Sequence, residues 1–149
     1  MPAYIPPLLG LIGLLIALGI FRVVLSYSEG SPEVKKIGDM IHSGAMSFMK
    51  TEYTYLVVFV FVLAGLVFFA LGWETATAVL VGASSSALAG FIGMFAATKA
   101  NTRTAAAASE SGAAAALSIS FYGGSIMGLC VASLGPVSYT HLRAHETNS

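Results

Sequence analysis

The most constraining feature of the sequence is an uninterrupted apolar run from Tyr55 to Trp73, YLVVFVFVLAGLVFFALGW. A helix of about 20 residues crosses the hydrocarbon core of a bilayer. A backbone in lipid must satisfy its hydrogen bonds internally, which helices do and irregular chain does not. The tyrosine and tryptophan at the ends of the run are typical of the membrane–water interfaces. The run therefore predicts a transmembrane helix.

Three further apolar stretches predict spans at 8–27, 76–98 and 112–134, in addition to 55–73. Only 9% of the 149 residues are charged, against about 25% in soluble proteins. The expected fold is an all-α, polytopic transmembrane bundle of four spans, with the lipid bilayer as its surroundings. The formal net charge is 0, which argues against a nucleic-acid partner.

The polar connection between the first two spans carries the pattern of an amphipathic helix. Ser31 before Pro32 is typical of a helix N-cap. Apolar residues then recur three and four positions apart, at Val34, Ile37, Ile41, Ala45 and Phe48. We expect this helix to lie in the cytoplasmic membrane interface before the chain turns into the bilayer. His42, on its more polar side, is interpreted as a surface residue rather than a metal ligand.

The basic residues predict the orientation. Those that border the spans fall at the first and third connections: Arg22, Lys35, Lys36, Lys50, Lys99 and Arg103. The second connection, GWET, has none and is very short. By the positive-inside rule, the first and third connections are cytoplasmic and the N-terminus is outside. The third connection, KANTRTAAAASES, is expected to be a turn.

Small residues recur every four positions in the last span, at Gly112, Ala116, Ser120, Gly124, Gly128 and Ala132. The third span has a shorter series of the same kind, at Gly82, Ser86 and Gly90. Such series let helix backbones approach closely in lipid, so both helices are expected to pack against other helices. The hydroxyls of 84–86 are expected to bond to carbonyls of their own helix. Cys130 is interpreted as a small packing residue.

The central parts of the spans hold no aspartate, glutamate, lysine or histidine, whereas ion pumps place such groups inside the membrane. The carboxylates of the connections, Glu29, Glu33, Asp39, Glu52 and Glu110, are interpreted as solvated. We therefore assign no catalytic, cofactor-binding or metal-ligating residue. Taken alone, the residues indicate a helical membrane module without an active site of its own.

The segment 136–149 differs abruptly from what precedes it. The sequence VSYTHLRAHETNS is polar and has no periodicity. A disordered outer tail is one interpretation. We favour another, in which the segment is a non-native tail translated from a library adaptor, and we exclude His141 and His145 from any site.

Two stretches resemble the membrane-bound, ion-translocating pyrophosphatases. IHSGAMSFMKTEY, from Ile41 to Tyr53, is similar to their N-terminal cytoplasmic motif. SALAGFIGMFAATKANTRTAAAA and FYGGSIMGL are similar to their third and fourth helices with the intervening loop. The resemblance covers residues 1 to about 135, and helix order and loop lengths agree with it.

The resemblance implies an N-terminal fragment of a homodimeric, sixteen-helix pump that hydrolyses Mg-pyrophosphate and drives protons or sodium ions across a membrane. Mg²⁺ and K⁺ are cofactors at the level of the family, with ligands outside this chain. The partners implied are pyrophosphate, the remaining helices and a second protomer. The location implied is a bacterial or archaeal plasma membrane, or an acidic organelle membrane. This fragment would supply outer scaffold helices and be inactive alone. The alternative is a small, self-contained structural or assembly subunit without catalytic activity.

Overall fold

A computed structural model describes residues 2–147, and they are almost entirely helical. The helices are α1 (Ile5–Ser26), α2 (Pro32–Leu71), α3 (Trp73–Glu110) and α4 (Ala113–Thr147). All four are long and apolar enough to cross a membrane. The prediction of an all-α bundle with four spans is confirmed.

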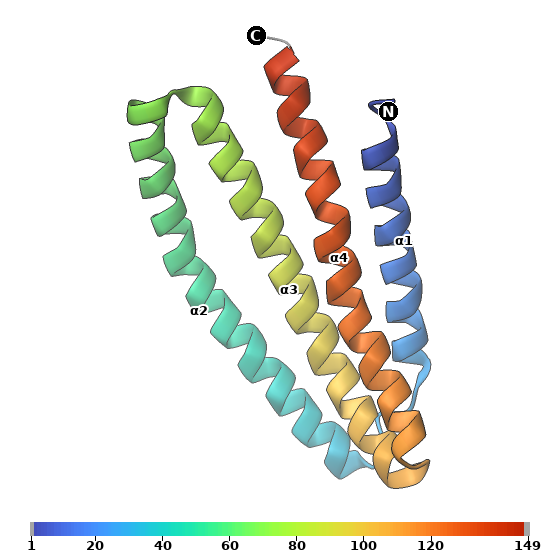
Figure 1. Ribbon diagram of the computed structural model, residues 1–149. Coiled ribbons are helices and arrows are strands. Elements are labelled where there is room, and N and C mark those ends of the chain that lie inside the picture. Colours follow the sequence, from blue (N-terminus) through green and yellow to red (C-terminus); the bar gives the residue numbers. More distant parts are fainter. Residues whose placement is uncertain (1, 148–149) are drawn as a thin grey trace.

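The helices stand side by side in the order α2, α3, α4, α1 (Figure 1). Among the described residues, α4 packs against both α3 and α1, whereas α2 packs against α3 alone. The chain enters α1 at one end of the bundle, and the α1–α2 and α3–α4 connections lie at the other (Figure 1). We call this second end the polar end, because the charged first connection lies there.

Two glycines make the tight turns that this packing requires. Gly72 alone separates α2 from α3, with φ +95°, and Gly112 follows α3 with φ +93°. Residues with a side chain rarely adopt this left-handed backbone, whereas glycine adopts it freely. The short second connection predicted from GWET is therefore confirmed.

The amphipathic segment after Ser31 is helical, but the expected turn into the membrane does not occur. Ser31 caps the helix by accepting a hydrogen bond from the Val34 backbone N–H. α2 then continues unbroken for 40 residues, which corresponds to about 60 Å, twice the hydrocarbon core. Its first half therefore projects beyond the apolar run instead of turning at the membrane. The segment lacks a proline after Pro32 to stop the helix.

The expected turn in KANTRTAAAASES is also wrong, because α3 runs through it to Glu110. Alanine has the highest helix propensity, and this stretch contains four consecutive alanines from Ala105 to Ala108. Ala100, Arg103 and Ala106 are also buried against neighbouring elements. The true turn is confined to the two residues Ser111 and Gly112.

Small residues form the contacts between α1, α3 and α4. A Cβ added at Gly10 would lie 2.6 Å from the Ser133 carbonyl oxygen, and one added at Gly123 would lie 2.6 Å from the Ala100 Cβ. Backbones this close leave no room for a larger residue. The main core cluster joins the same three helices through Ala17, Val24, Ala96, Ala100, Ile126 and Cys130. The interpretation of Cys130 as a packing residue is confirmed.

The small-residue series of α4 lies mostly outside these contacts. Ala116 is buried, but Ser120, Gly124, Gly128 and Ala132 are exposed. A Cβ added at Gly124 or Gly128 would meet nothing within 4 Å. Helix packing within the described residues therefore uses other glycines than those of the predicted series.

The hydroxyl of Ser85, one of the three serines at 84–86, also behaves differently from expectation. Ser85 Oγ lies 2.6 Å from Ser138 Oγ on α4, and Ser138 Oγ donates to the Leu134 carbonyl. Ser85 thus bonds across to a neighbouring helix, because α4 offers a hydroxyl at the same level. α4 continues through Pro136 to Thr147, so the backbone of 136–147 is not the irregular tail that its composition suggested. The side chains of His141 and His145 lie outside the described residues.

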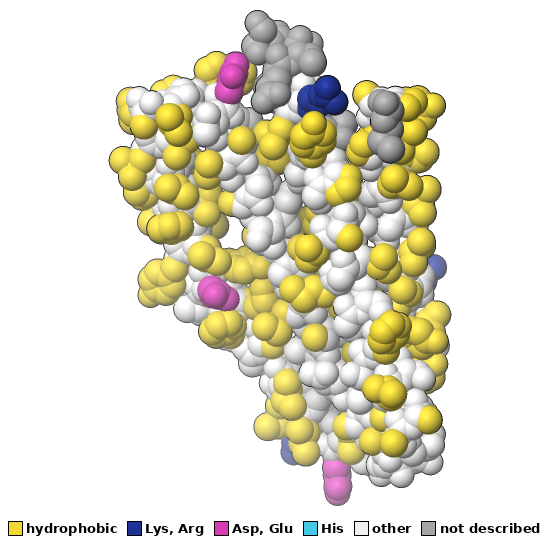
Figure 2. Space-filling model, viewed as in Figure 1, with side chains coloured by type: hydrophobic (Ala, Val, Ile, Leu, Met, Phe, Trp, Pro, Cys, Tyr) yellow, Lys and Arg dark blue, Asp and Glu magenta, His cyan; other side chains and the backbone are white. Residues whose placement is uncertain are grey.

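Large apolar side chains cover much of the surface (Figure 2). The most exposed belong to the apolar run of α2, where Phe69 is 88% exposed and Tyr55 74%. Such a surface is suited to lipid or to another apolar element, not to water. The described helices therefore form an integral, multi-pass membrane protein.

Candidate functional site

The polar end is held together by Arg103, a buried residue with 6% of its surface exposed. Its Nε donates to the Tyr27 carbonyl at 3.2 Å, and its Nη1 donates to the Lys99 carbonyl at 2.9 Å. Its Nη2 lies 3.4 Å from Glu29 Oε1. A guanidinium fixes several oxygens in one geometry, so Arg103 fastens the first connection onto α3.

Glu29 receives a second cation, because Lys35 Nζ lies 3.6 Å from its other oxygen. The interpretation of Glu29 as a solvated carboxylate is therefore wrong. Gly30, with φ +86°, brings the connection so close to α3 that an added Cβ would lie 2.8 Å from the Ala106 Cβ. We call Arg103, Glu29 and Lys35 the Arg103 clamp. Sequence reasoning missed it, although an arginine inside an alanine-rich helix is a signal for a buried cation.

The projecting half of α2 packs on α3 through a seam that includes His42. His42 Nδ1 lies 2.6 Å from Thr98 Oγ1. The imidazole also meets the edge of the Phe95 ring, with 5.0 Å between centroids. One turn earlier on α2, Gly38 lies against Thr102 with no space for a Cβ. His42 is therefore a half-buried packing residue, which corrects its interpretation as a surface residue.

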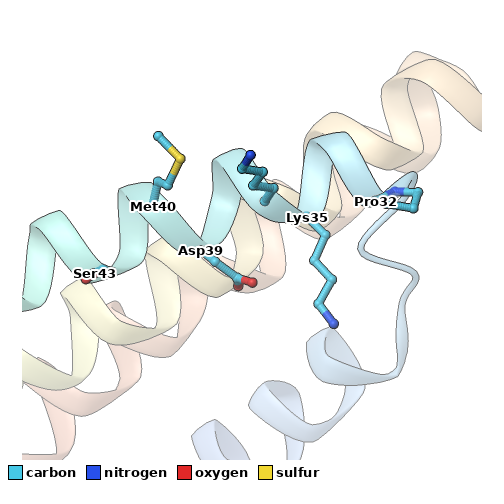
Figure 3. A pocket seen from close by; sticks show the side chains of 6 residues that line it. Pro32, Lys35, Asp39, Met40 and Ser43 are labelled. Atoms are coloured by element: carbon cyan, nitrogen blue, oxygen red, sulfur yellow. The ribbon is translucent and has the colours of Figure 1, made fainter.

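An open hollow lies on the first turns of α2 (Figure 3). It is lined by Pro32, Lys35, Lys36, Asp39, Met40 and Ser43. All of these side chains project from the same helix, and Met40 points away from Lys35 and Asp39 (Figure 3). No second element closes the hollow, so it does not form a built binding site.

A second hollow lies between α1 and α3, over α4. It has a volume of about 330 Å³ and apolar lining: Leu14, Ala17, Leu18, Phe21, Phe91, Ile92, Phe95, Ala96, Ile126 and Cys130. It exists because α1 and α3 both pack on α4 but touch each other little. We call it the apolar groove.

Within residues 2–147, the described side chains include no group of three or more histidine, cysteine, aspartate or glutamate residues that could hold a metal ion. The Arg103 clamp is occupied by its own partners, and the apolar groove is lined by hydrocarbon side chains and the one buried thiol of Cys130. Both stabilise and shape the bundle.

Comparison with known proteins gives the family. The model of the family described as "Inorganic H+ pyrophosphatase" matches residues 11–146. The chain belongs to this family.

Curated members of the pyrophosphatase family are similar to most of this chain. A putative K⁺-stimulated pyrophosphate-energised sodium pump of Clostridium tetani is 42% identical over 122 residues, which are 82% of this chain and 18% of the relative. A K⁺-insensitive pyrophosphate-energised proton pump of Methanosarcina mazei is 41% identical over 130 residues, 86% of this chain and 19% of the relative. A K⁺-stimulated sodium pump of Thermotoga maritima is 40% identical over 122 residues, 78% and 17%. The chain thus spans about a fifth of the length of these pyrophosphatases.

Proposed function

We propose that this chain is the N-terminal membrane portion of an ion pump that couples hydrolysis of Mg-pyrophosphate to transport of protons or sodium ions. The observation that carries the proposal is the match of residues 11–146 to the pyrophosphatase family. The relatives named above are pyrophosphate-energised pumps of both ions, so the family supports either cation.

In this proposal the four helices are scaffold, and the reaction takes place elsewhere in the longer protein. The central parts of the spans carry no ionisable carboxylate, lysine or histidine, although ion translocation relies on such groups. The charged residues that the structure does bring together, Arg103 and Glu29, neutralise each other at the polar end. We assign the residues that would bind pyrophosphate and Mg²⁺ to the parts of the pump beyond this chain, together with any K⁺ site.

The proposed orientation places the polar end, with the Arg103 clamp, in the cytoplasm, and the start of α1 outside. The positive-inside rule supports it, because the basic residues of 22–50 and 99–103 lie toward this end. The membrane would be a bacterial or archaeal plasma membrane. The remaining helices of the pump and a second protomer would pack against exposed apolar surfaces outside the apolar groove.

The test is to compare this chain with the longer reading frame from the same source DNA. We expect purified 1–149 to release no phosphate from Mg-pyrophosphate above background. We expect vesicles that contain the longer product to release phosphate and to accumulate protons or sodium ions. Turnover by 1–149 alone would overturn the assignment of the chemistry to other segments.

The same DNA tests whether 136–149 is native, which we propose it is not. The family match runs to residue 146 and α4 runs to Thr147, so composition is the ground for this proposal. A frame that departs from VSYTHLRAHETNS after Pro136 would support it. A confirmed stop after Ser149 would contradict it and favour the self-contained subunit instead.

A further inference from the structure

We propose that the apolar groove between α1 and α3 is a binding site for one acyl chain of an anionic phospholipid, with the headgroup at Lys99. The proposal rests on the groove and its charge, not on the pumping activity. It therefore stands or falls separately from the proposed function.

The shape and lining of the groove suit a hydrocarbon chain. All ten lining residues are apolar, and the lined part of α1, from Leu14 to Phe21, extends about 10 Å along the helix axis. Leu18 is 50% exposed and Phe91 41%, so the groove opens sideways out of the bundle. A hollow of about 330 Å³ that opens toward lipid at this depth would take up an acyl chain rather than water, because its lining offers water no hydrogen bonds.

The end of the groove nearer the polar end is aromatic. Phe95 forms this end, and its ring centroid lies 5.9 Å from that of Phe21 and 6.3 Å from that of Phe91. His42 also packs against the Phe95 ring, with 5.0 Å between the ring centroids, and holds it in place. The groove is therefore closed by rigid rings at the level where the apolar part of α3 ends.

A cation lies at this closed end. Lys99 Nζ is 5.9 Å from the centroid of the Phe95 ring, one helical turn beyond it. Lys99 follows directly after the predicted span 76–98, so its ammonium is at the height of the headgroups. It belongs to neither of the ion pairs of the Arg103 clamp. Other charged groups near this point are Asp39 and, when protonated, His42, both on α2. The ion pair of Arg103 with Glu29 is also near, since Arg103 donates to the Lys99 carbonyl.

The apolar groove suits the acyl chain of an anionic phospholipid, and the Lys99 ammonium suits its negatively charged headgroup. Basic positions beside grooves between transmembrane helices are typical of sites for anionic headgroups, and one lysine near the surface contributes about a fivefold preference. A neutral lipid would fill the groove but gain nothing from Lys99. A second copy of one of these apolar helices is a poorer occupant, because it would bring no anionic group to the ammonium.

The experiment measures lipid retained by the purified 149-residue chain. The chain in detergent micelles is titrated with phosphatidylglycerol or phosphatidylcholine, and bound lipid is counted by native mass spectrometry. We expect phosphatidylglycerol to bind about fivefold more tightly, and Lys99→Gln to remove this preference. Lys50→Gln, an exposed lysine near the start of the α2 apolar run, is the matched control and should keep it.

A second pair of variants tests the groove and leaves the charge of Lys99 unchanged. Leu18→Trp adds bulk to a groove-lining, half-exposed position, and we expect it to lower the affinity for both lipids. Leu15→Trp adds the same bulk at 59% exposure outside the groove lining and should leave affinity unchanged. Equal affinity for both lipids in the unaltered chain would overturn the proposal. So would unchanged lipid binding in both Lys99→Gln and Leu18→Trp. Cross-linking of a second copy through the groove would also overturn it.

Discussion

At the scale of single residues, the burial of charged side chains has a large effect on the stability of the bundle. A guanidinium that leaves water loses hydration, and the loss is offset only if its hydrogen-bond donors find acceptors. Arg103 finds two carbonyls and one carboxylate, from two parts of the chain: the first connection and its own helix, α3. The clamp therefore stabilises the bundle only while all its members are present.

We expect Arg103→Met to lower the free energy of unfolding by about 3 kcal/mol, because the change leaves Glu29 half-buried beside a single lysine and removes the donors to two carbonyls. Circular dichroism during denaturant titration in micelles measures this. Lys36→Met, at an exposed lysine of the same region, should change stability by less than about 0.5 kcal/mol. Equal losses in the two variants would show that the clamp contributes nothing specific.

The sequence predicted the surroundings of some of these side chains and not of others. Ser31 and Cys130 were predictable, because a helix cap and a small apolar packing residue depend on their neighbours in sequence. His42 and Glu29 were not, because each finds its partner on a distant segment. Thr98 is 56 positions from His42, and Arg103 is buried only because the first connection folds over it. From the local sequence pattern alone, a polar residue such as His42 or Glu29 is expected to be exposed to solvent.

At the scale of helices, the contacts between α1 and α4 depend on glycines that carry no side chain between them. Ser133 of α4 lies against both Gly10 and Gly13 of α1. In lipid this close packing is the main source of helix association, because both helices are equally apolar to the membrane. A single methyl group at such a point must push the helices apart.

We expect Gly10→Ala to lower the free energy of unfolding by about 1–3 kcal/mol, because the new Cβ meets a backbone oxygen that cannot move aside. Gly19→Ala, on the same helix, places its Cβ in open space. It should stabilise the chain by up to about 1 kcal/mol through helix propensity. The same denaturant titration compares the two, and a loss at Gly19 equal to that at Gly10 would contradict this account.

The number and type of helices followed from the apolar runs, but their lengths did not. Hydropathy indicates which part of a helix lies in lipid. The local hydropathy is low around Lys35 and Asn101 although α2 and α3 continue through them, so it does not show where a helix ends. The continuity of α2 and α3 depends on packing between their projecting halves, at Gly38 against Thr102 and at His42 against Thr98. Those contacts join residues far apart in sequence, so the sequence pattern alone suggested a bend and a turn.

At the scale of the whole molecule, the length of α2 is about twice the thickness of the hydrocarbon core. The apolar run occupies the second half of α2, so the first half extends beyond the hydrocarbon core. The polar end would thus hold the Arg103 clamp outside the hydrocarbon core, one helical turn beyond Lys99. Its side of the membrane is open to direct measurement.

We expect a cysteine at Ser43 to react with a membrane-impermeant maleimide only from the cytoplasmic side, and one at Thr75 only from outside. Both substitutions are made in a Cys130→Ser background, because Cys130 is the one native cysteine. Both positions are exposed and lie toward opposite ends of the bundle. Intact cells and inverted vesicles distinguish the two sides. The reverse labelling pattern would overturn the proposed orientation.

The single residue that joins α2 to α3 also has a consequence for biosynthesis. With only Gly72 between them, the two helices cannot enter the bilayer as independent segments separated by a translocated loop. The strongly apolar α2 must hold its position while α3, rich in glycine, serine and alanine, follows it as the second arm of a hairpin. Insertion of the less apolar arm thereby depends on the more apolar one. Until α3 has left the ribosome as well, α2 lacks the helix that it packs against.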